Sequence, residues 1–241
     1  MKKQKIKFPD TIILAGGLGT RLKPVINDLP KCMAPIDGKP FIDFILDYCT
    51  RQGLKRFIFC LGHLKEIIID HLSSRNDCET LFSIEKKILG TGGAIKNAEN
   101  FICSNQSIIL NGDTFVDINY SKLIDWHNDK GSEITLVINK IDDPARYGLV
   151  NFDYNNKIQS FIEKKEGVKS GWINSGVYII NNSILESLTE GEYYSLERDL
   201  FPKYLNKRFF AYQNDGIMID IGTPESYLKS QSIIKLLNTY D

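Results

Sequence analysis

The segment Thr11-Ile-Ile-Leu-Ala-Gly-Gly-Leu-Gly-Thr-Arg-Leu22 contains the pattern that decides the fold. Its first residues are apolar or β-branched, which is typical of a strand buried in a sheet. Glycines follow at once, and glycine lets backbone N–H groups approach a bound anion closely. Arg21 adds a guanidinium suited to phosphate, and Lys31 supplies a second cation. The segment therefore predicts a phosphate-binding loop directly after a buried strand.

Two well-known phosphate-binding loops do not match this segment. The Rossmann pattern G-x-G-x-x-G fails because no third glycine follows Gly17 and Gly19 at the required spacing. The P-loop fails because no glycine here is followed by lysine and then serine or threonine. The alternative is a glycine-rich connection without a ligand, but Arg21 and Lys31 favour binding.

Strand-like and helical segments alternate along the chain. Helical spacing or composition predicts helices over 41–51, 65–72, 94–101 and 195–205. Apolar runs predict strands over 57–61, 81–84, 107–110, 134–139, 149–154, 158–162 and 176–180. Thr223-Pro224 is typical of the start of a last helix. This order predicts an α/β fold, a three-layer α/β/α, Rossmann-like arrangement around a mixed, mostly parallel sheet.

Composition narrows the class of protein. The 241 residues include 30 Lys plus Arg and 30 Asp plus Glu, so no basic excess indicates a nucleic-acid partner. The five cysteines are odd in number and show no C-x-x-C spacing, which argues against a disulfide framework or a zinc site. Met1 to Lys7 is basic but lacks the apolar run of a signal peptide, and no stretch is apolar enough to span a membrane. We expect a cytoplasmic protein with no membrane partner.

Leu14 to Leu22, followed by Pro30-Lys31-Cys32-Met33-Ala34-Pro35, resembles the nucleotide-binding signature of sugar-1-phosphate nucleotidyltransferases. Further matching segments follow in family order at 90–94, 111–113, 163–164, 174–176 and 220–224. The resemblance implies a nucleotide-diphospho-sugar transferase, GT-A-like fold. It also implies a single domain over 1–241, with a nucleotide-binding part at about 8–130, a sugar-binding part at about 131–222 and a C-terminal helix at about 223–239.

In this family a sugar-1-phosphate oxygen attacks the α-phosphorus of a nucleoside triphosphate and pyrophosphate leaves, which requires positioning and charge neutralisation. By resemblance the catalytic residues would be Arg21 on the departing phosphates, Lys31 on the phosphate under attack, and Asp113. The nucleotide would be bound by Leu14, Ala15, Gly16, Gly17, Gly19, Thr20, Glu85, Gly90, Thr91 and Gly92. The sugar phosphate would be bound by Gly112, Gly148, Glu163, Lys164 and Asn174.

Asp113 and Asp220 each follow an apolar run, so both carboxylates are expected at strand ends, where α/β sheets bind ligands. Magnesium prefers one or two carboxylates together with phosphate oxygens and water. The pair therefore predicts a Mg²⁺ site. Two alternatives stay open, because Asn111-Gly112 is also typical of a hairpin turn and Asp220 could simply precede a helix.

Within the family, the chain most resembles the short bacterial guanylyltransferases for D-glycero-D-manno-heptose 1-phosphate, through LAGGLGTRL, LGTGGAI, NGDTF and Ser195 to Pro202. This implies GTP and that heptose phosphate as partners, and a GDP-heptose product for lipopolysaccharide or capsule synthesis. Alternatives are mannose 1-phosphate with GTP, or glucose or N-acetylated sugar phosphates with UTP, dTTP or CTP.

An alternative of another class is a non-catalytic, nucleotide-sugar-binding regulatory subunit. The joint presence of Arg21, Lys31, Asp113, Lys164 and Asp220 favours the enzyme. Ile88 and Cys32 stand where relatives often carry proline, which leaves the geometry of base recognition open. A homo-oligomer is compatible with the sequence, because Tyr193-Tyr194 and the C-terminal helix suit an interface or the core.

Overall fold

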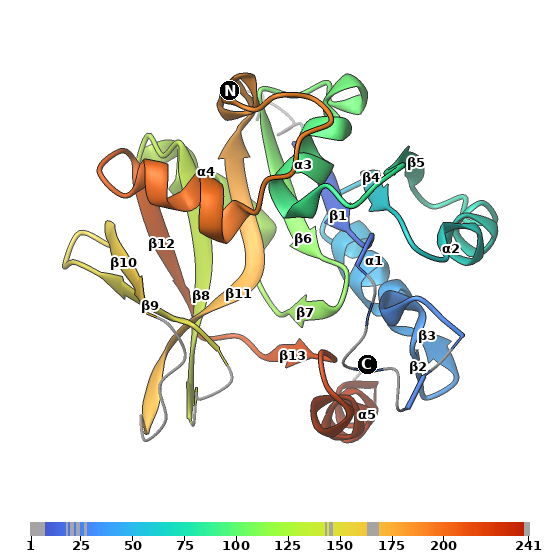
Figure 1. Ribbon diagram of the computed structural model, residues 1–241. Coiled ribbons are helices and arrows are strands. Elements are labelled where there is room, and N and C mark those ends of the chain that lie inside the picture. The colour runs from blue at the N-terminus through green and yellow to red at the C-terminus, as the bar shows by residue number, and fades with distance from the viewer. Residues whose placement is uncertain are drawn as a thin grey trace, which may run out of the picture.

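A computed structural model describes residues 8–17, 19, 22, 25, 26, 28–142, 144, 147–162 and 169–238. Figure 1 shows one twisted sheet running across the molecule, with helices on both sides. Its main strand order is β10-β9-β11-β6-β1-β4-β5, and β8 and β12 continue from β11. The predicted α/β class with a mixed, mostly parallel sheet is confirmed.

The first part of the sheet is parallel. Its strands are β1 (Asp10–Leu14), β4 (Arg56–Leu61), β5 (Glu79–Ile84) and β6 (Gln106–Asn111). β1 lies in the middle, so Leu14 is opposite Cys60 on one side and Asn111 on the other. The carboxyl ends of these strands therefore meet at one edge of the sheet.

The second part is joined to the first through β11 (Ser170–Asn181), which pairs antiparallel with β6. β11 also pairs antiparallel with β8 (Ile134–Asp142), and its register shifts between Asn174 and Tyr178. The remaining strands are β9 (Leu149–Phe152), β10 (Ile158–Ile162), β12 (Phe209–Asn214), β7 (Thr114–Val116), β13 (Met218–Asp220), β2 (Pro35–Ile36) and β3 (Lys39–Pro40). β7 and β13 form a separate antiparallel pair below β6 in Figure 1.

The helices are α1 (Phe41–Arg51), α2 (Lys65–Leu72), α3 (Gly90–Asn97), α4 (Tyr120–Asp129) and α5 (Pro224–Asn238). Successive side chains of a strand point to opposite faces, so each buried strand feeds two cores. Ile13 packs in the cluster with α1 and α2, whereas Ile12 packs in the cluster with α3. Burying both faces explains why these strands are continuously apolar.

Several predicted elements differ from the structure, and three of them have a clear physical reason. The segment 195–205 forms a π-helical turn at Leu196–Leu200 and a 3-10 turn at Phe201–Tyr204, because Pro202 has no N–H for an α-helical bond. α3 begins at Gly90 instead of residue 94, since the Gly92 and Gly93 N–H groups both donate to the Tyr194 carbonyl. β9 ends at Phe152, where the Asp153 carboxylate accepts two backbone N–H groups and forms a turn.

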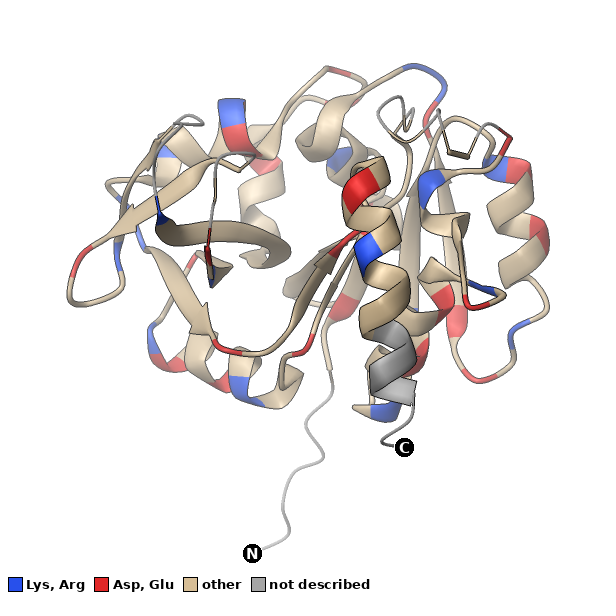
Figure 2. Cartoon of the chain, turned by 90° about the horizontal axis from the view of Figure 1, so that it is seen from below, with Lys and Arg blue, Asp and Glu red and all other residues tan. Residues whose placement is uncertain are grey.

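Three general properties of the chain are its charge distribution, its cysteines and the apolar character of its helices. Lys and Arg are interspersed with Asp and Glu along the chain (Figure 2), and the numbers of the two signs are equal. All five cysteines are free thiols. No helix among the described residues has both the length and the apolar character needed to cross a bilayer.

Candidate active site

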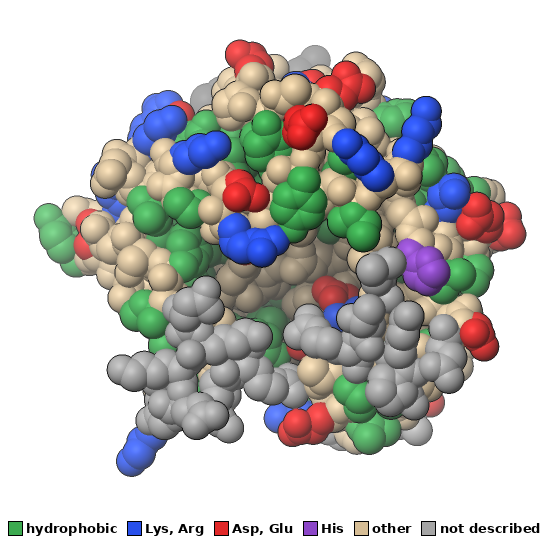
Figure 3. Space-filling model, in the orientation of Figure 1, with side chains coloured by type: hydrophobic (Ala, Val, Ile, Leu, Met, Phe, Trp, Pro, Cys, Tyr) green, Lys and Arg blue, Asp and Glu red, His purple; other side chains and the backbone are tan. Residues whose placement is uncertain are grey.

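A cavity of about 500 Å³ lies at the carboxyl ends of the parallel strands. The hollow is visible in the middle of the face shown in Figure 3. β1, β4, β5 and β6 end at or next to residues that line it, as is expected for ligand sites in α/β sheets. The lining includes Leu14, Ala15, Gly16, Gly17, Gly19, Lys31, Cys32, Cys60, Glu85, Ile88, Gly90, Thr91, Ala94, Asn111, Gly112, Asp113 and Gly222.

At one end of the cavity, a cation pairs with one carboxylate and lies beside a second. The Lys31 ammonium donates to Asp113 Oδ2. A Cβ placed on Gly222 would lie 3.2 Å from Lys31 Nζ and 2.8 Å from Asp220 Oδ1, so the glycine leaves room for these two side chains to approach each other. The β7–β13 pairing sets Asp220 opposite Thr114, which directly follows Asp113. Residues far apart in the sequence therefore meet in one charged group.

Both carboxylates are held by their surroundings. Asp220 Oδ1 accepts the Gly222 N–H at 2.8 Å, and Oδ2 accepts the Tyr147 hydroxyl at 3.1 Å. The Asp113 side chain keeps 30% of its exposure, so it is open to ligands as well as to Lys31. Carboxylate oxygens from two residues fit the ligand preference of magnesium in a phosphate site. No cluster of three or more His, Cys, Asp or Glu metal ligands occurs in the described part of the chain.

The hairpin-turn alternative is wrong, whereas Asp220 does precede a helix, since α5 begins at Pro224. Asn111-Gly112 does not form a β-hairpin turn, since β7 pairs with β13 and not with β6. Asp220 is not the N-cap of α5. Thr223 has that place, because its Oγ1 accepts the Ser226 N–H at 3.3 Å.

Another part of the cavity wall carries a half-buried carboxylate. Glu85 Oε1 lies so close to Gly16 that a Cβ there would overlap it, and Oε2 accepts the Leu89 N–H at 3.1 Å. Burial raises the pKa of Glu85, and the Leu89 N–H lowers it by less. Beside it, Ile88 lines the cavity with 66% of its surface exposed. A carboxylate acceptor and an apolar side chain therefore stand together at this wall.

Two other predicted nucleotide-binding residues serve mainly to join segments of the protein. Thr91 lines the cavity, but its hydroxyl accepts the Leu196 N–H at 2.8 Å and lies 3.3 Å from Glu197 Oε2. Gly92 is buried and does not line the cavity, because its N–H donates to the Tyr194 carbonyl.

The other predicted site residues fall into two groups. Gly112 lines the cavity, whereas Gly148 and Asn174 do not line it within the described structure. Thr20, Arg21, Glu163 and Lys164 lie outside the described residues.

Cys32 lines the cavity but is 3% exposed. Burial, followed by the charge of Asp113, raises the pKa of its thiol to about 12. A thiol with that pKa stays protonated near neutral pH, so Cys32 packs against the site and is no nucleophile.

A family model described as nucleotidyl transferase matches residues 10–235. The chain belongs to the nucleotidyl transferase family. It is 42% identical over 217 residues to the D-glycero-alpha-D-manno-heptose 1-phosphate guanylyltransferase of Campylobacter jejuni, covering 90% of this chain and 96% of that protein. It is 32% identical over 223 residues to the mannose-1-phosphate guanylyltransferase catalytic subunit beta of Drosophila pseudoobscura pseudoobscura, covering 90% of this chain and 60% of that protein.

Solved structures have the same fold. The nucleotidyl transferase described here superimposes on HddC from Yersinia pseudotuberculosis with a TM-score of 0.85 at 39% identity, covering 94% of this chain and 100% of that chain. HddC was also solved in complex with GMP-PN, with the same TM-score, identity and coverage.

Several residues of this nucleotidyl transferase site were missed in the sequence. Asn111 and Gly222 lie inside recognised motifs, so their place in the cavity lining could have been predicted from the sequence. Cys60 is the counterpart of Leu14 on the neighbouring strand, and the pairing of two strand ends could have indicated it. Tyr147 carried no such signal, because its contact with Asp220 depends on the path of the chain before β9.

Proposed function

We propose that this nucleotidyl transferase transfers a guanylyl group from GTP to D-glycero-D-manno-heptose 1-phosphate, releasing pyrophosphate and forming a GDP-heptose. The observation that carries the proposal is the similarity, over nine tenths of the chain, to a guanylyltransferase named for that sugar. We also propose that the reaction takes place in the cytoplasm and supplies lipopolysaccharide or capsule synthesis.

Glu85 supports guanine as the base. Guanine presents two neighbouring donors, N1–H and N2–H₂, which a carboxylate can accept together. Glu85 lines the cavity, and its only hydrogen bond within the described structure comes from Leu89. Adenine carries an unprotonated N1 at the same edge, so the carboxylate would repel it. The apolar face of Ile88 would cover the base beside this carboxylate.

The charged group at the other end supports phosphate chemistry. Lys31 and Asp113 line the cavity and Asp220 lies beside them, so Lys31 would neutralise charge on the phosphate under attack. Asp113 and Asp220 would hold Mg²⁺, which supplies charge neutralisation and orientation of the triphosphate. Tyr147 and the Gly222 N–H would keep Asp220 aimed at the cavity. The attacking sugar phosphate would enter from the side of Gly112.

A second candidate substrate is mannose 1-phosphate with GTP, because a mannose-1-phosphate guanylyltransferase subunit also resembles the chain over nine tenths of its length. Both sugars share the manno configuration near the reacting phosphate. The choice depends on side chains that contact the far end of the sugar, where the heptose carries an additional carbon.

The test is a grid of nucleoside triphosphates against sugar 1-phosphates, scored by pyrophosphate release with and without Mg²⁺. We expect the highest kcat/KM for GTP with D-glycero-D-manno-heptose 1-phosphate, loss of turnover with EDTA, and recovery with added Mg²⁺. A higher kcat/KM for mannose 1-phosphate would establish the second candidate. No pyrophosphate release in any combination would favour the regulatory subunit.

The base assignment has its own test. In Glu85→Gln, one acceptor oxygen becomes a donor, so the KM for GTP should rise about tenfold, as expected for loss of a hydrogen bond to a charged group. Glu190→Gln is a matched control, since Glu190 is exposed and away from the cavity. An unchanged KM for GTP in Glu85→Gln would exclude Glu85 as the group that recognises guanine.

A further inference from the structure

A chain of hydrogen bonds runs from Thr91, which lines the cavity, to Asn174 on β11 in the second part of the sheet. Asn174 Nδ2 donates to the Tyr178 hydroxyl at 2.8 Å, and that hydroxyl lies 3.4 Å from Glu197 Oε1. Glu197 Oε2 accepts the Ser195 hydroxyl at 3.0 Å and lies 3.3 Å from the Thr91 hydroxyl. One carboxylate therefore connects the start of α3 with the bulged part of β11.

The donor-to-acceptor direction of this hydrogen-bond chain is determined by two groups, one that can only donate and one that can only accept. A backbone N–H can only donate, and the Gly176 N–H donates to Asn174 Oδ1 at 2.8 Å. An ionised carboxylate can only accept, so Glu197 obliges the Tyr178 hydroxyl to donate toward it. The Tyr178 oxygen is then left to accept from the Asn174 amide. Both ends thus impose the same orientation on the side chain of Asn174.

The Asn174–Tyr178 bulge lies against the cavity. A Cβ on Gly176 would be 2.5 Å from Asn111 Nδ2, and Asn111 lines the cavity next to Gly112 and Asp113. Tyr178 is fully buried. Its pKa is raised well above the usual value, mainly by burial and then by Glu197, with a further contribution from Asp113. A change at Glu197 would therefore be transmitted through buried groups to a part of β11 that borders the site.

We infer that Glu197 is a positioning residue for the sugar 1-phosphate, because it fixes the side-chain orientation of Asn174 through Tyr178 while it holds Thr91 of the nucleotide side. The inference rests on the proposed function and on the role in sugar binding that the family resemblance implies for Asn174. Glu197 itself does not line the cavity within the described structure, so it acts through its neighbours. Among the described residues it has no cationic partner, which leaves its oxygens to the three hydroxyls.

Glu197 has two contacts to test, a Tyr178 arm and a Thr91 arm. Glu197→Gln changes both, and Tyr178→Phe changes only the first. Glu197→Gln replaces one acceptor by a donor, whereas Tyr178→Phe removes the hydroxyl and leaves the contact between Glu197 and Thr91. We expect each variant to raise the KM for the sugar 1-phosphate about tenfold, the size expected for one hydrogen bond to a charged group. In Tyr178→Phe the KM for GTP should stay within about twofold, since the Thr91 arm is intact.

A double-mutant cycle separates positioning from general loosening. If both changes break the same chain, the double variant should show the sugar KM of a single variant and not the product of the two effects. Glu190→Gln serves as the matched control, with wild-type KM values expected. Melting temperatures measured in parallel would show whether each variant is folded.

Crystal structures of wild type and Glu197→Gln give a readout without activity. In the variant we expect Asn174 Nδ2 to leave hydrogen-bond distance of the Tyr178 hydroxyl. An unmoved Asn174 would overturn the inference. So would a folded Glu197→Gln variant whose sugar KM lies within about twofold of wild type. If wild type releases no pyrophosphate with any substrate pair, the proposed function fails, and the crystal structures alone decide the orientation of Asn174.

Discussion

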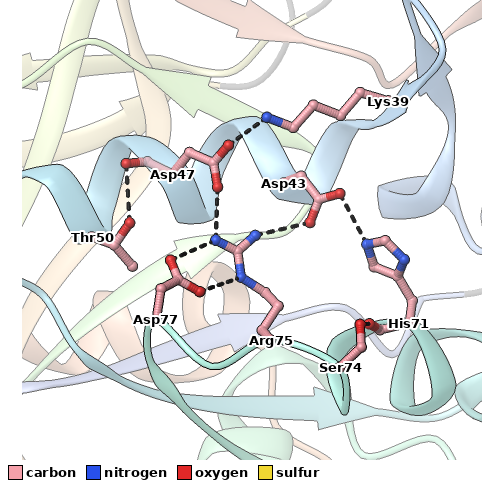
Figure 4. A network of polar contacts seen from close by, with 8 residues as sticks. All are labelled: Lys39, Asp43, Asp47, Thr50, His71, Ser74, Arg75 and Asp77. Carbon is pink, nitrogen blue, oxygen red and sulfur yellow. Dashed lines mark hydrogen bonds and ion pairs between the residues drawn. The ribbon is translucent and has the colours of Figure 1, made fainter.

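Two groups of aspartates surround a basic side chain in this molecule, and they are built differently. In the Arg75 network, the guanidinium contacts Asp43 at 3.0 Å, Asp47 at 2.7 Å and Asp77 at 2.8 Å (Figure 4). In the cavity, the ammonium of Lys31 contacts Asp113 and lies beside Asp220. A guanidinium is a planar fork with five donors, whereas an ammonium is a compact point charge.

The Arg75 network is satisfied by protein groups. Arg75 Nε and Nη2 donate to both oxygens of Asp77, Lys39 adds a contact to Asp47, and His71 Nε2 lies 2.9 Å from Asp43 Oδ2. Asp43 and Asp47 belong to α1, while Arg75 and Asp77 lie between α2 and β5 (Figure 4). The network therefore connects two elements on one side of the sheet. Its geometry points to stability and not to ligand binding.

The cavity group is arranged for an additional ligand. Lys31 pairs with Asp113 and lies beside Asp220, and both carboxylates stand at strand ends beside a cavity large enough for a nucleotide. The comparison shows that a count of acidic and basic residues does not distinguish the two groups. What distinguishes them is where they stand, because Lys31 and Asp113 line the cavity and the residues of the Arg75 network do not.

The largest effect is expected from Asp113→Asn. The amide has nearly the same shape but no charge, so kcat should fall about 10²- to 10³-fold, while the free energy of unfolding changes by about 0.5 kcal/mol. Turnover and urea unfolding of the same preparations measure this. Asp125→Asn, an exposed position on α4, is the control and should keep wild-type kcat. An active Asp113→Asn variant would contradict the metal assignment.

Lys31→Ala should have the next largest effect. Removal of the ammonium takes away charge neutralisation at the phosphate, so kcat should fall about 10²-fold. The side chain is 14% exposed, yet its partner Asp113 can be solvated from the cavity, so the protein should remain folded. Circular dichroism and pyrophosphate release measure the two quantities. If the variant unfolds, the main role of Lys31 is to stabilise the fold, as we infer for Arg75.

Most of the fold was predictable, because buried strands are recognised in the sequence as apolar runs. The α1 and α2 bounds agree with the expected ranges, and the parallel strands β1, β4, β5 and β6 were expected to within one or two residues at their ends. β12 was missed in the sequence, since its alternation in Phe209–Asn214 is short and comes directly after a loop. The length of β11 was missed because the bulge near Gly176 interrupts its pattern.

The candidate site was predictable where motifs carry it and not where packing does. Lys31, Asp113 and Asp220 were expected together from their motifs, and the structure brings them together. The contacts of Tyr147 with Asp220 and of Glu197 with Tyr178 join positions 73 and 19 residues apart through side chains. No local spacing encodes such contacts, because they depend on how β9, β11 and the π-helical turn are placed on the sheet.

Arg75→Met tests the other half of the comparison. The substitution keeps an unbranched apolar stem but leaves three aspartates without their shared cation, so the free energy of unfolding should fall by about 2 kcal/mol. The kcat should stay within about twofold, because the network does not reach the cavity. Lys122→Met at an exposed position is the control. A loss of turnover without a loss of stability in Arg75→Met would show that the network acts on the site.

The smallest effect is the pH dependence of that same stability. The hydrogen bond from Arg75 lowers the pKa of Asp77, and in Asp47 the bonds from Lys39 and Arg75 outweigh burial and also lower the pKa. Each carboxylate thus stays ionised in the folded protein below its unfolded value of 3.8, so its stabilisation is present above that pH and is lost as the pH falls further. The stability difference between wild type and Arg75→Met should therefore narrow between about pH 5 and pH 2.5, which urea unfolding at a series of pH values measures. A constant difference would mean that Arg75 stabilises the fold by the packing of its stem and not by its charge.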